Sequence, residues 1–119
     1  MNHQNGRKKL NLNPQHKRSL MRNQAIMLIE KGHLVSTVAR IKEVRRFAEK
    51  LVTLARNGND FNTRRRAQAL LPYKDAALVK LFLEIAPRFK QRPGGYTRII
   101  PVPRRISDTA EIARLEWVE

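Results

Sequence analysis

The sequence predicts an α+β protein in which helices pack on one face of a small β-sheet, in two layers. Apolar residues recur with a helical period through most of the chain, whereas its C-terminal part shows the alternation that is typical of strands. The chain has 119 residues, of which 41% are hydrophobic, and this is enough for one domain with a core. We expect a basic flexible arm at residues 1–12, followed at 13–119 by a helix, a short strand, three helices and a C-terminal β-hairpin.

The N-terminal third of the chain predicts the arm, the first helix and the short strand. Residues 1–12 are basic and hold too few apolar side chains to bury, so this arm should stay disordered until it binds a partner. Asn13 can cap a helix that begins at Pro14, because the N–H that proline lacks has no partner in a first turn anyway. The helix should end just before Gly32, which adopts left-handed backbone easily. Residues 33–37 are then typical of a short strand.

The second helix has the clearest apolar period. Steps of three and four residues connect its apolar positions, which are Ile41, Val44, Ala48, Leu51 and Ala55. Gly58 should end it. Its opposite face carries four Lys or Arg residues, with Glu43 and Glu49 among them at spacings that allow ion pairs along the helix. This face is either a solvated, self-paired surface or a contact with an anionic partner such as nucleic acid.

Two shorter helices precede the hairpin. A helix from Asn62 to Leu71 contains three consecutive Arg residues, of which at least one must face solvent, and Pro72 should end it. Asp75 should cap the next helix, and Pro87 should close it.

The C-terminal segment predicts the hairpin. Two strand patterns, at residues 96–102 and 112–118, are separated by a polar turn around Ser107-Asp108. In the second strand Ala113, Leu115 and Trp117 alternate with charged residues, so one face of the sheet should be buried.

Positive charge is the strongest compositional signal. The chain has 25 Lys or Arg against 10 Asp or Glu, a formal net charge of +15. Such an excess suits an anionic partner, and nucleic acid is the first candidate. Residues 1–29 and 88–105 each carry six Lys or Arg and no acid, whereas 108–119 carries four acids. Acid-free basic segments favour contacts with phosphates.

The residue patterns of enzymes and metal sites do not occur in the sequence. The three histidines, at positions 3, 16 and 33, have no carboxylate at metal-ligand spacing. The serines lack the Gly-flanked turn that exposes a nucleophile, and Gly94-Gly95 does not lead into the helix of a phosphate-binding loop. The chain has no cysteine. We therefore expect no enzymatic activity, no metal and no cofactor.

The segment RFKQRPGGYTRII, residues 88–100, is the densest candidate interface. Gly94 and Gly95 have no Cβ and can lie close to a sugar-phosphate backbone, and Tyr96 offers a ring for stacking on a base. The cations that can reach phosphates beside them are Arg88, Lys90, Arg92 and Arg98. A plainer interpretation stays open, in which Pro93 and the two glycines form only a turn and Tyr96 is only a core residue.

Two other classes of protein would share this charge. A free DNA-binding architectural protein is the main alternative, but the sequence indicates no recognition helix, dimer seam or intercalating wedge. A peripheral membrane protein would need bulky apolar residues opposite cations on a helix. The first helix partly fits this pattern, although the aromatic content of 6% counts against it. The first thirty residues lack the apolar stretch of a signal peptide or membrane span.

Several motifs, taken in order, resemble one known family. They are Leu10-Asn11, His16, Arg22-Asn23, Lys42-Glu43 with Arg45-Arg46, Leu81-Phe82 and, most specifically, APRF at 86–89 followed by RPGGYTR at 92–98. This order resembles the bacterial-type large-subunit ribosomal protein seventeen family. The resemblance implies a non-enzymatic structural protein of the large ribosomal subunit that supports translation, a monomer within the ribosome and not a membrane protein. It implies binding to large-subunit ribosomal RNA near the exit of the nascent-peptide tunnel, beside proteins twenty-two and thirty-two. The location would be the cytoplasm, with an organellar ribosome still open.

The chain departs from the family pattern at a few positions. Asn2 stands where Arg is usual and Leu12 where a basic residue is common. Pro101 and Pro103 interrupt a strand that normally lacks proline, so this strand should lie at a sheet edge or end near Ile100. The candidate RNA-binding residues are Arg7, Lys8, Lys9, His16, Lys17, Arg18, Arg22, Arg64, Arg65, Arg88, Lys90, Arg92, Gly94, Gly95, Tyr96, Arg98, Arg104 and Arg105.

Overall fold

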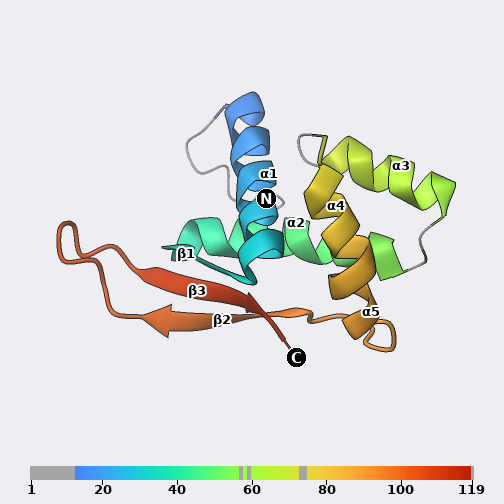
Figure 1. Ribbon diagram of the computed structural model, residues 1–119. Helices are drawn as coiled ribbons and strands as arrows, with labels where there is room; N and C mark the ends of the chain where they lie inside the picture. The colour runs from blue at the N-terminus through green and yellow to red at the C-terminus, as the bar shows by residue number, and fades with distance from the viewer. Residues whose placement is uncertain (1–12, 57, 59, 73–74, 119) are drawn as a thin grey trace, which may run out of the picture.

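The structure, a computed structural model, describes residues 13–56, 58, 60–72 and 75–118 and has the predicted α+β architecture (Figure 1). The elements are α1 (Pro14–Lys31), β1 (His33–Thr37), α2 (Val38–Arg56), α3 (Phe61–Leu70), α4 (Asp75–Lys80), the π-helical turn η1 (Leu81–Ile85), α5 (Ala86–Arg88), β2 (Thr97–Val102) and β3 (Ile112–Trp117). The predicted arm at 1–12, with Arg7, Lys8 and Lys9, lies outside the described residues.

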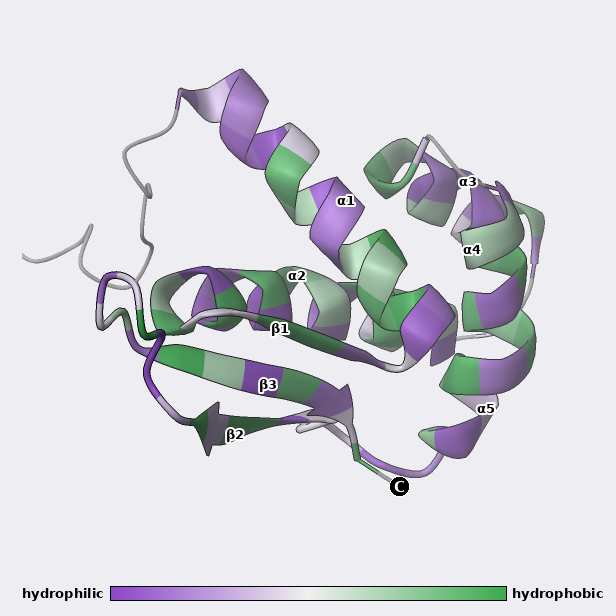
Figure 2. Cartoon of the chain, turned by 60° about the vertical axis from the view of Figure 1, so that its left-hand side comes forward, coloured by the Kyte–Doolittle hydropathy of each residue, from purple (hydrophilic) through white to green (hydrophobic). Residues whose placement is uncertain are grey.

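The three strands form an antiparallel sheet in the order β1-β3-β2, with β2 and β3 as the predicted hairpin. Leu115 on the central strand lies between Leu34 of β1 and Ile99 of β2 and is fully buried. The helix α2 lies along the sheet, and α1 rises across α2 (Figure 2). The two prolines predicted that this strand either lies at a sheet edge or ends near Ile100. β2 is an edge strand and continues through Pro101 to Val102, so the first alternative is confirmed.

The predicted start and end signals of the first helix are confirmed. The Asn13 side chain accepts a hydrogen bond of 2.7 Å from the backbone N–H of His16. Gly32 ends the helix with a left-handed φ of 82°, and its N–H donates to the Leu28 carbonyl at 2.8 Å. The Trp117 indole N–H donates to the same carbonyl at 3.2 Å. A side-chain hydrogen bond therefore joins the end of β3 to the last turn of α1.

Two predicted boundaries of the last helix are wrong. Asp75 is the first residue of α4 and not its cap, and the helix does not close at Pro87 but continues through η1 to Arg88. In an α-helix the proline ring would clash with the carbonyl four residues earlier. Here the helix widens before it, and the Ala86 N–H donates to the Leu81 carbonyl five residues back. The wider turn makes room for the proline, so Arg88 still lies on the helix.

The helix α3 begins at Phe61 and ends at Leu70, each one residue earlier than predicted, because Asp60 is its cap. The Asp60 carboxylate accepts a hydrogen bond of 2.6 Å from the backbone N–H of Thr63. This bond is the main reason that the pKa of Asp60 lies below its ordinary value of 3.8, and the Thr63 side chain lowers it further.

Acid should weaken α3 through this cap. Because the folded-state pKa of Asp60 is lowered, the ionised cap stabilises the fold above pH 3.8, and this contribution is lost as the pH falls below that value. Asp60→Asn keeps a capping oxygen but cannot titrate. Thermal melts at about pH 7 and about pH 3 should show a smaller acid-induced drop in Tm for this variant than for the wild type. Equal drops in the two proteins would contradict the role of Asp60.

Candidate nucleic-acid interface

The loop between α5 and β2 is held against the polar side of α2. The Glu49 carboxylate accepts hydrogen bonds from the backbone N–H groups of Tyr96 at 2.9 Å and Thr97 at 3.4 Å. The Arg56 guanidinium donates to the Tyr96 hydroxyl at 2.9 Å and to the Lys90 carbonyl at 3.1 Å. These contacts fix both halves of the loop to one rigid helix. The sequence did not single out Glu49 or Arg56 for this role, because their partners lie 34 or more positions away.

The mixed-charge face of α2 is self-paired at two of its four cations, Arg45 and Arg46, which agrees in part with one of its two interpretations. Arg45 lies 3.7 Å from Glu49, and Arg46 lies 3.8 Å from Glu43. Lys17 of α1, a candidate RNA-binding residue, also lies 3.7 Å from Glu43. Glu43 and Glu49 therefore both form ion pairs with nearby cations, and Glu49 also accepts the hydrogen bonds from the loop.

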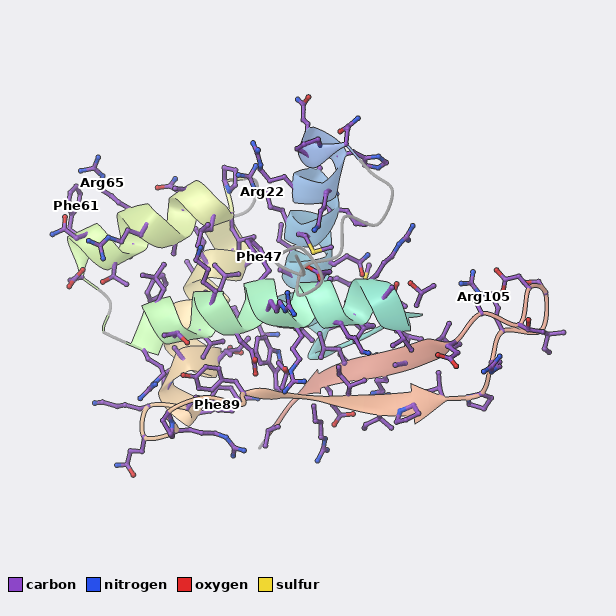
Figure 3. All side chains as sticks on the ribbon, turned by 180° about the vertical axis from the view of Figure 1, so that it is seen from behind. Arg22, Phe47, Phe61, Arg65, Phe89 and Arg105 are labelled. Carbon is purple, nitrogen blue, oxygen red and sulfur yellow. The ribbon has the colours of Figure 1, made fainter. Side chains whose placement is uncertain are left out.

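Tyr96 is a core residue and cannot stack on a base in this fold. Only 1% of it is exposed, and its ring packs against Phe89 with ring centroids 5.2 Å apart. Phe89 in turn packs against Trp117 at 6.1 Å (Phe89 is labelled in Figure 3). The predicted stacking role is wrong, and the plainer interpretation of a core ring is right. Burial of the Tyr96 ring against Phe89 inside the core is the physical reason.

The two glycines before Tyr96 face open space. A Cβ added at Gly94 or Gly95 would meet no atom within 4 Å. Gly95 has a left-handed φ of 63°, so a side chain there would strain the backbone, whereas Gly94 has no such requirement. The surface over the loop is therefore free for another molecule to approach, and its contact with RNA stays a prediction.

The cations at the start of this loop are exposed and available to a partner. Arg88 and Lys90 are exposed, and their side chains make no hydrogen bond or ion pair with any residue that the structure describes. The Arg92 Nε donates to the Gly94 carbonyl at 3.2 Å, which leaves its terminal nitrogens free. These three residues form what we call the loop cluster.

The cations of the hairpin, in contrast, are already paired. The three candidate cations form the pairs Arg98–Glu116 at 2.7 Å, Arg104–Glu111 at 2.8 Å and Arg105–Asp108 at 3.4 Å. Arg114 also pairs with Glu116, at 3.1 Å. The hydrogen bond from Arg98 lowers the pKa of Glu116. In the sequence the segment 88–105 has no acid, but the antiparallel hairpin brings Asp108, Glu111 and Glu116 back beside its arginines. A phosphate would have to replace or share these ion pairs.

Comparisons with known proteins confirm the family resemblance. Residues 20–118 match the model of the family described as ribosomal protein L17. The chain belongs to the ribosomal protein L17 family. The large ribosomal subunit protein bL17 of Campylobacter jejuni subsp. jejuni is 44% identical over 118 residues, which cover 99% of both chains. The bL17 protein of Bdellovibrio bacteriovorus is 47% identical over 103 residues, or 87% of this chain, and the chain spans 56% of that relative's length.

In this L17-family chain, the helix α1 both exposes cations and holds α3. His16 and Arg18 are exposed near its start. Arg22 reaches across to the end of α3, where its guanidinium donates to the carbonyls of Leu70 at 3.1 Å and Ala69 at 3.4 Å (Figure 3). A cation at a helix C-terminus satisfies carbonyls that have no partner in the helix and complements the helix dipole. Arg22, predicted to bind RNA, therefore has a structural role in positioning α3.

The three arginines of α3 are all exposed. The Arg64 Nε donates weakly to the Asp60 carbonyl at 3.4 Å, and Arg65 lies over the ring of Phe61 with its guanidinium carbon 5.5 Å from the ring centroid. The prediction that at least one of the three faces solvent is confirmed. Phe61 was not among the candidate residues, and it lies one residue before the predicted start of this helix.

The candidate RNA-binding residues of this L17-family chain do not form one cluster. The loop cluster lies at the α5 end of the sheet, while Arg105 lies at the hairpin tip at the opposite end, and α3 forms a separate corner (Figures 1 and 3). Such a distribution suits a partner that extends over several sides of the domain, as folded RNA does.

In the described part of the L17-family chain, no group of three or more His, Asp or Glu side chains could hold a metal ion, and no helix is long and apolar enough to cross a membrane. The expectation of no enzymatic activity and no cofactor stays a prediction.

Proposed function

We propose that this chain is a structural constituent of the large ribosomal subunit and binds large-subunit ribosomal RNA, mainly through contacts with phosphates. Membership of the L17 family and the net charge of +15 support this function. The relatives that match over nearly their whole length are named large ribosomal subunit proteins. The chain acts as a monomer within cytoplasmic ribosomes and has no catalytic role.

The finer location follows from the same resemblance. We place the chain near the exit of the nascent-peptide tunnel, beside proteins twenty-two and thirty-two of the large subunit. The order of motifs from Leu10-Asn11 to RPGGYTR, which resembles that family, supports this location. The basic segment 1–12 would add phosphate contacts through Arg7, Lys8 and Lys9.

The loop cluster is the observation that carries the proposal. Arg88 and Lys90 are exposed and have no acidic partner among the described residues, and the adjacent Gly94 presents no side chain. Glu49 and Arg56 fix this loop to α2, so RNA binding would lose little backbone entropy there. A rigid, unpaired and positive surface is what phosphate contacts require.

Fractionation of native lysate on sucrose gradients tests the proposed function. At low salt the chain should sediment with large subunits, and brief digestion with ribonuclease should release it while deoxyribonuclease should not. Release by deoxyribonuclease would support the alternative of a free DNA-binding architectural protein. Sedimentation as a free protein at low salt, without nuclease, would contradict both functions.

A further inference from the structure

Phe61 is an aromatic residue that the fold leaves in solvent. It is 65% exposed, and it lies at the first position of α3 with its side chain directed away from the rest of the domain (Figure 3). It does not line the groove between α3 and α4, whose lining residues are Arg64, Gln68, Asp75, Leu78, Val79, Phe82 and Leu83. Phe61 is therefore separate from the apolar residues of that groove.

Arg65 covers one face of this ring. Residues four apart lie on the same side of a helix, and the Arg65 guanidinium carbon is 5.5 Å from the Phe61 ring centroid. Arg65 is exposed and makes no ion pair or hydrogen bond with any residue in the described part of the chain. The ring and the guanidinium thus form an exposed pair of flat groups, which we call the Phe61–Arg65 platform.

The charge around the platform is positive. The helix α3 contains no acid between Phe61 and Leu70, and its cap Asp60 already accepts the Thr63 N–H at 2.6 Å. Arg64 and Arg66 are exposed on either side of Arg65. An apolar pocket of a protein partner would have to remove water from these guanidinium groups, whereas phosphates beside a stacked base would neutralise them.

We propose that the Phe61–Arg65 platform stacks an unpaired nucleobase of RNA, with Arg64 and Arg66 on the phosphates that flank it. This inference rests on the proposed function and adds a contact with a base to the phosphate contacts of the loop cluster. Unpaired bases in RNA loops and bulges stack on aromatic rings and guanidinium planes, and such stacking tolerates different bases.

The test compares two single-stranded 12-nucleotide RNA probes of equal charge, one with uracil at every position and one with abasic sites throughout. Fluorescence anisotropy at constant salt should show that the wild type binds the base-bearing probe about tenfold more tightly. Phe61→Leu keeps an apolar side chain of similar size but no aromatic face, so it should lose this preference. Phe61→Trp should retain it.

The outcomes separate this proposal from the proposed function. If Phe61→Leu keeps the tenfold preference, or if the wild type shows none, the stacking platform is excluded while phosphate binding to both probes stands. If neither probe binds to any protein, the phosphate contacts themselves fail. Because Phe61 is exposed, thermal melts of both variants should match the wild type, and a lowered melt would place the ring in the core and contradict the proposal.

Discussion

Tyr96→Ala is expected to lower the free energy of unfolding by about 4 kcal/mol, in the range for removal of a buried aromatic ring. Tyr96 is among the largest fully buried side chains, and its ring packs against Phe89 at 5.2 Å. A domain of this size is stable by about 5–15 kcal/mol, so a large share of the stability would be lost. Urea unfolding followed by circular dichroism would measure the change.

Tyr96→Phe is the matched control. It keeps the ring in the core but removes the hydroxyl that accepts hydrogen bonds from Arg56 at 2.9 Å and Thr53 at 3.4 Å. Its expected cost is about 1 kcal/mol. If the alanine variant were as stable as the phenylalanine variant, the ring would not lie in the core, and its role in stacking would have to be reconsidered.

The affinity for large-subunit RNA should fall steeply with salt. If about eight phosphates are neutralised, the logarithm of the affinity should fall against the logarithm of salt concentration with a slope of roughly −6 to −7. Between about 50 and 200 mM salt the affinity would then drop by about four orders of magnitude. Filter binding to purified bacterial large-subunit RNA at four or more salt concentrations would give the slope. A slope near −1 is incompatible with binding dominated by phosphate contacts.

Paired variants locate these contacts. Arg88→Ala with Lys90→Ala should flatten the slope by about two, one for each phosphate contact. Lys31→Ala with Lys50→Ala removes the same charge from exposed positions outside the candidate set and should leave the slope unchanged. Equal flattening in both pairs would mean that total charge, and not the loop cluster, sets the affinity.

Arg98 offers a further comparison, because it is already paired with Glu116 at 2.7 Å. Its replacement by alanine should flatten the slope by less than the replacement of Arg88 does, since a phosphate must compete with the carboxylate. The same measurement therefore compares how much paired and unpaired cations contribute to phosphate binding.

Elements that depend on near neighbours could be predicted from the sequence. The caps at Asn13 and Gly32 act within four residues, and the alternation of β3 is a local pattern. The prediction that the last helix ends at Pro87 was wrong, because the rule that proline ends a helix assumes α-helical geometry. The π-helical turn before it changes that geometry, and no local pattern announced the turn.

The candidate interface was harder to predict, because the contacts that decide it span the chain. Charge along the sequence marked residues 88–105 as cationic and without acids, and in the structure only Arg88, Lys90 and Arg92 of this segment have no acidic partner among the described residues. It could not show that the hairpin pairs Arg104 with Glu111, or that Arg22 binds carbonyls 47 and 48 positions away. A buried and a stacking tyrosine also look alike in sequence. Only the packing around Tyr96 distinguishes them.

The edge position of β2 has a consequence for the protein before it meets its partner. Pro101 cannot donate to β3, so its nitrogen lies on the outer side of the strand, and the N–H groups of Ile99 and Thr97 point the same way. The Thr97 N–H is already occupied by Glu49 at 3.4 Å, which leaves Ile99 as the sole outward donor along β2. A newly synthesised copy thus offers a single outward N–H donor along this strand, which disfavours edge-to-edge pairing with another copy there.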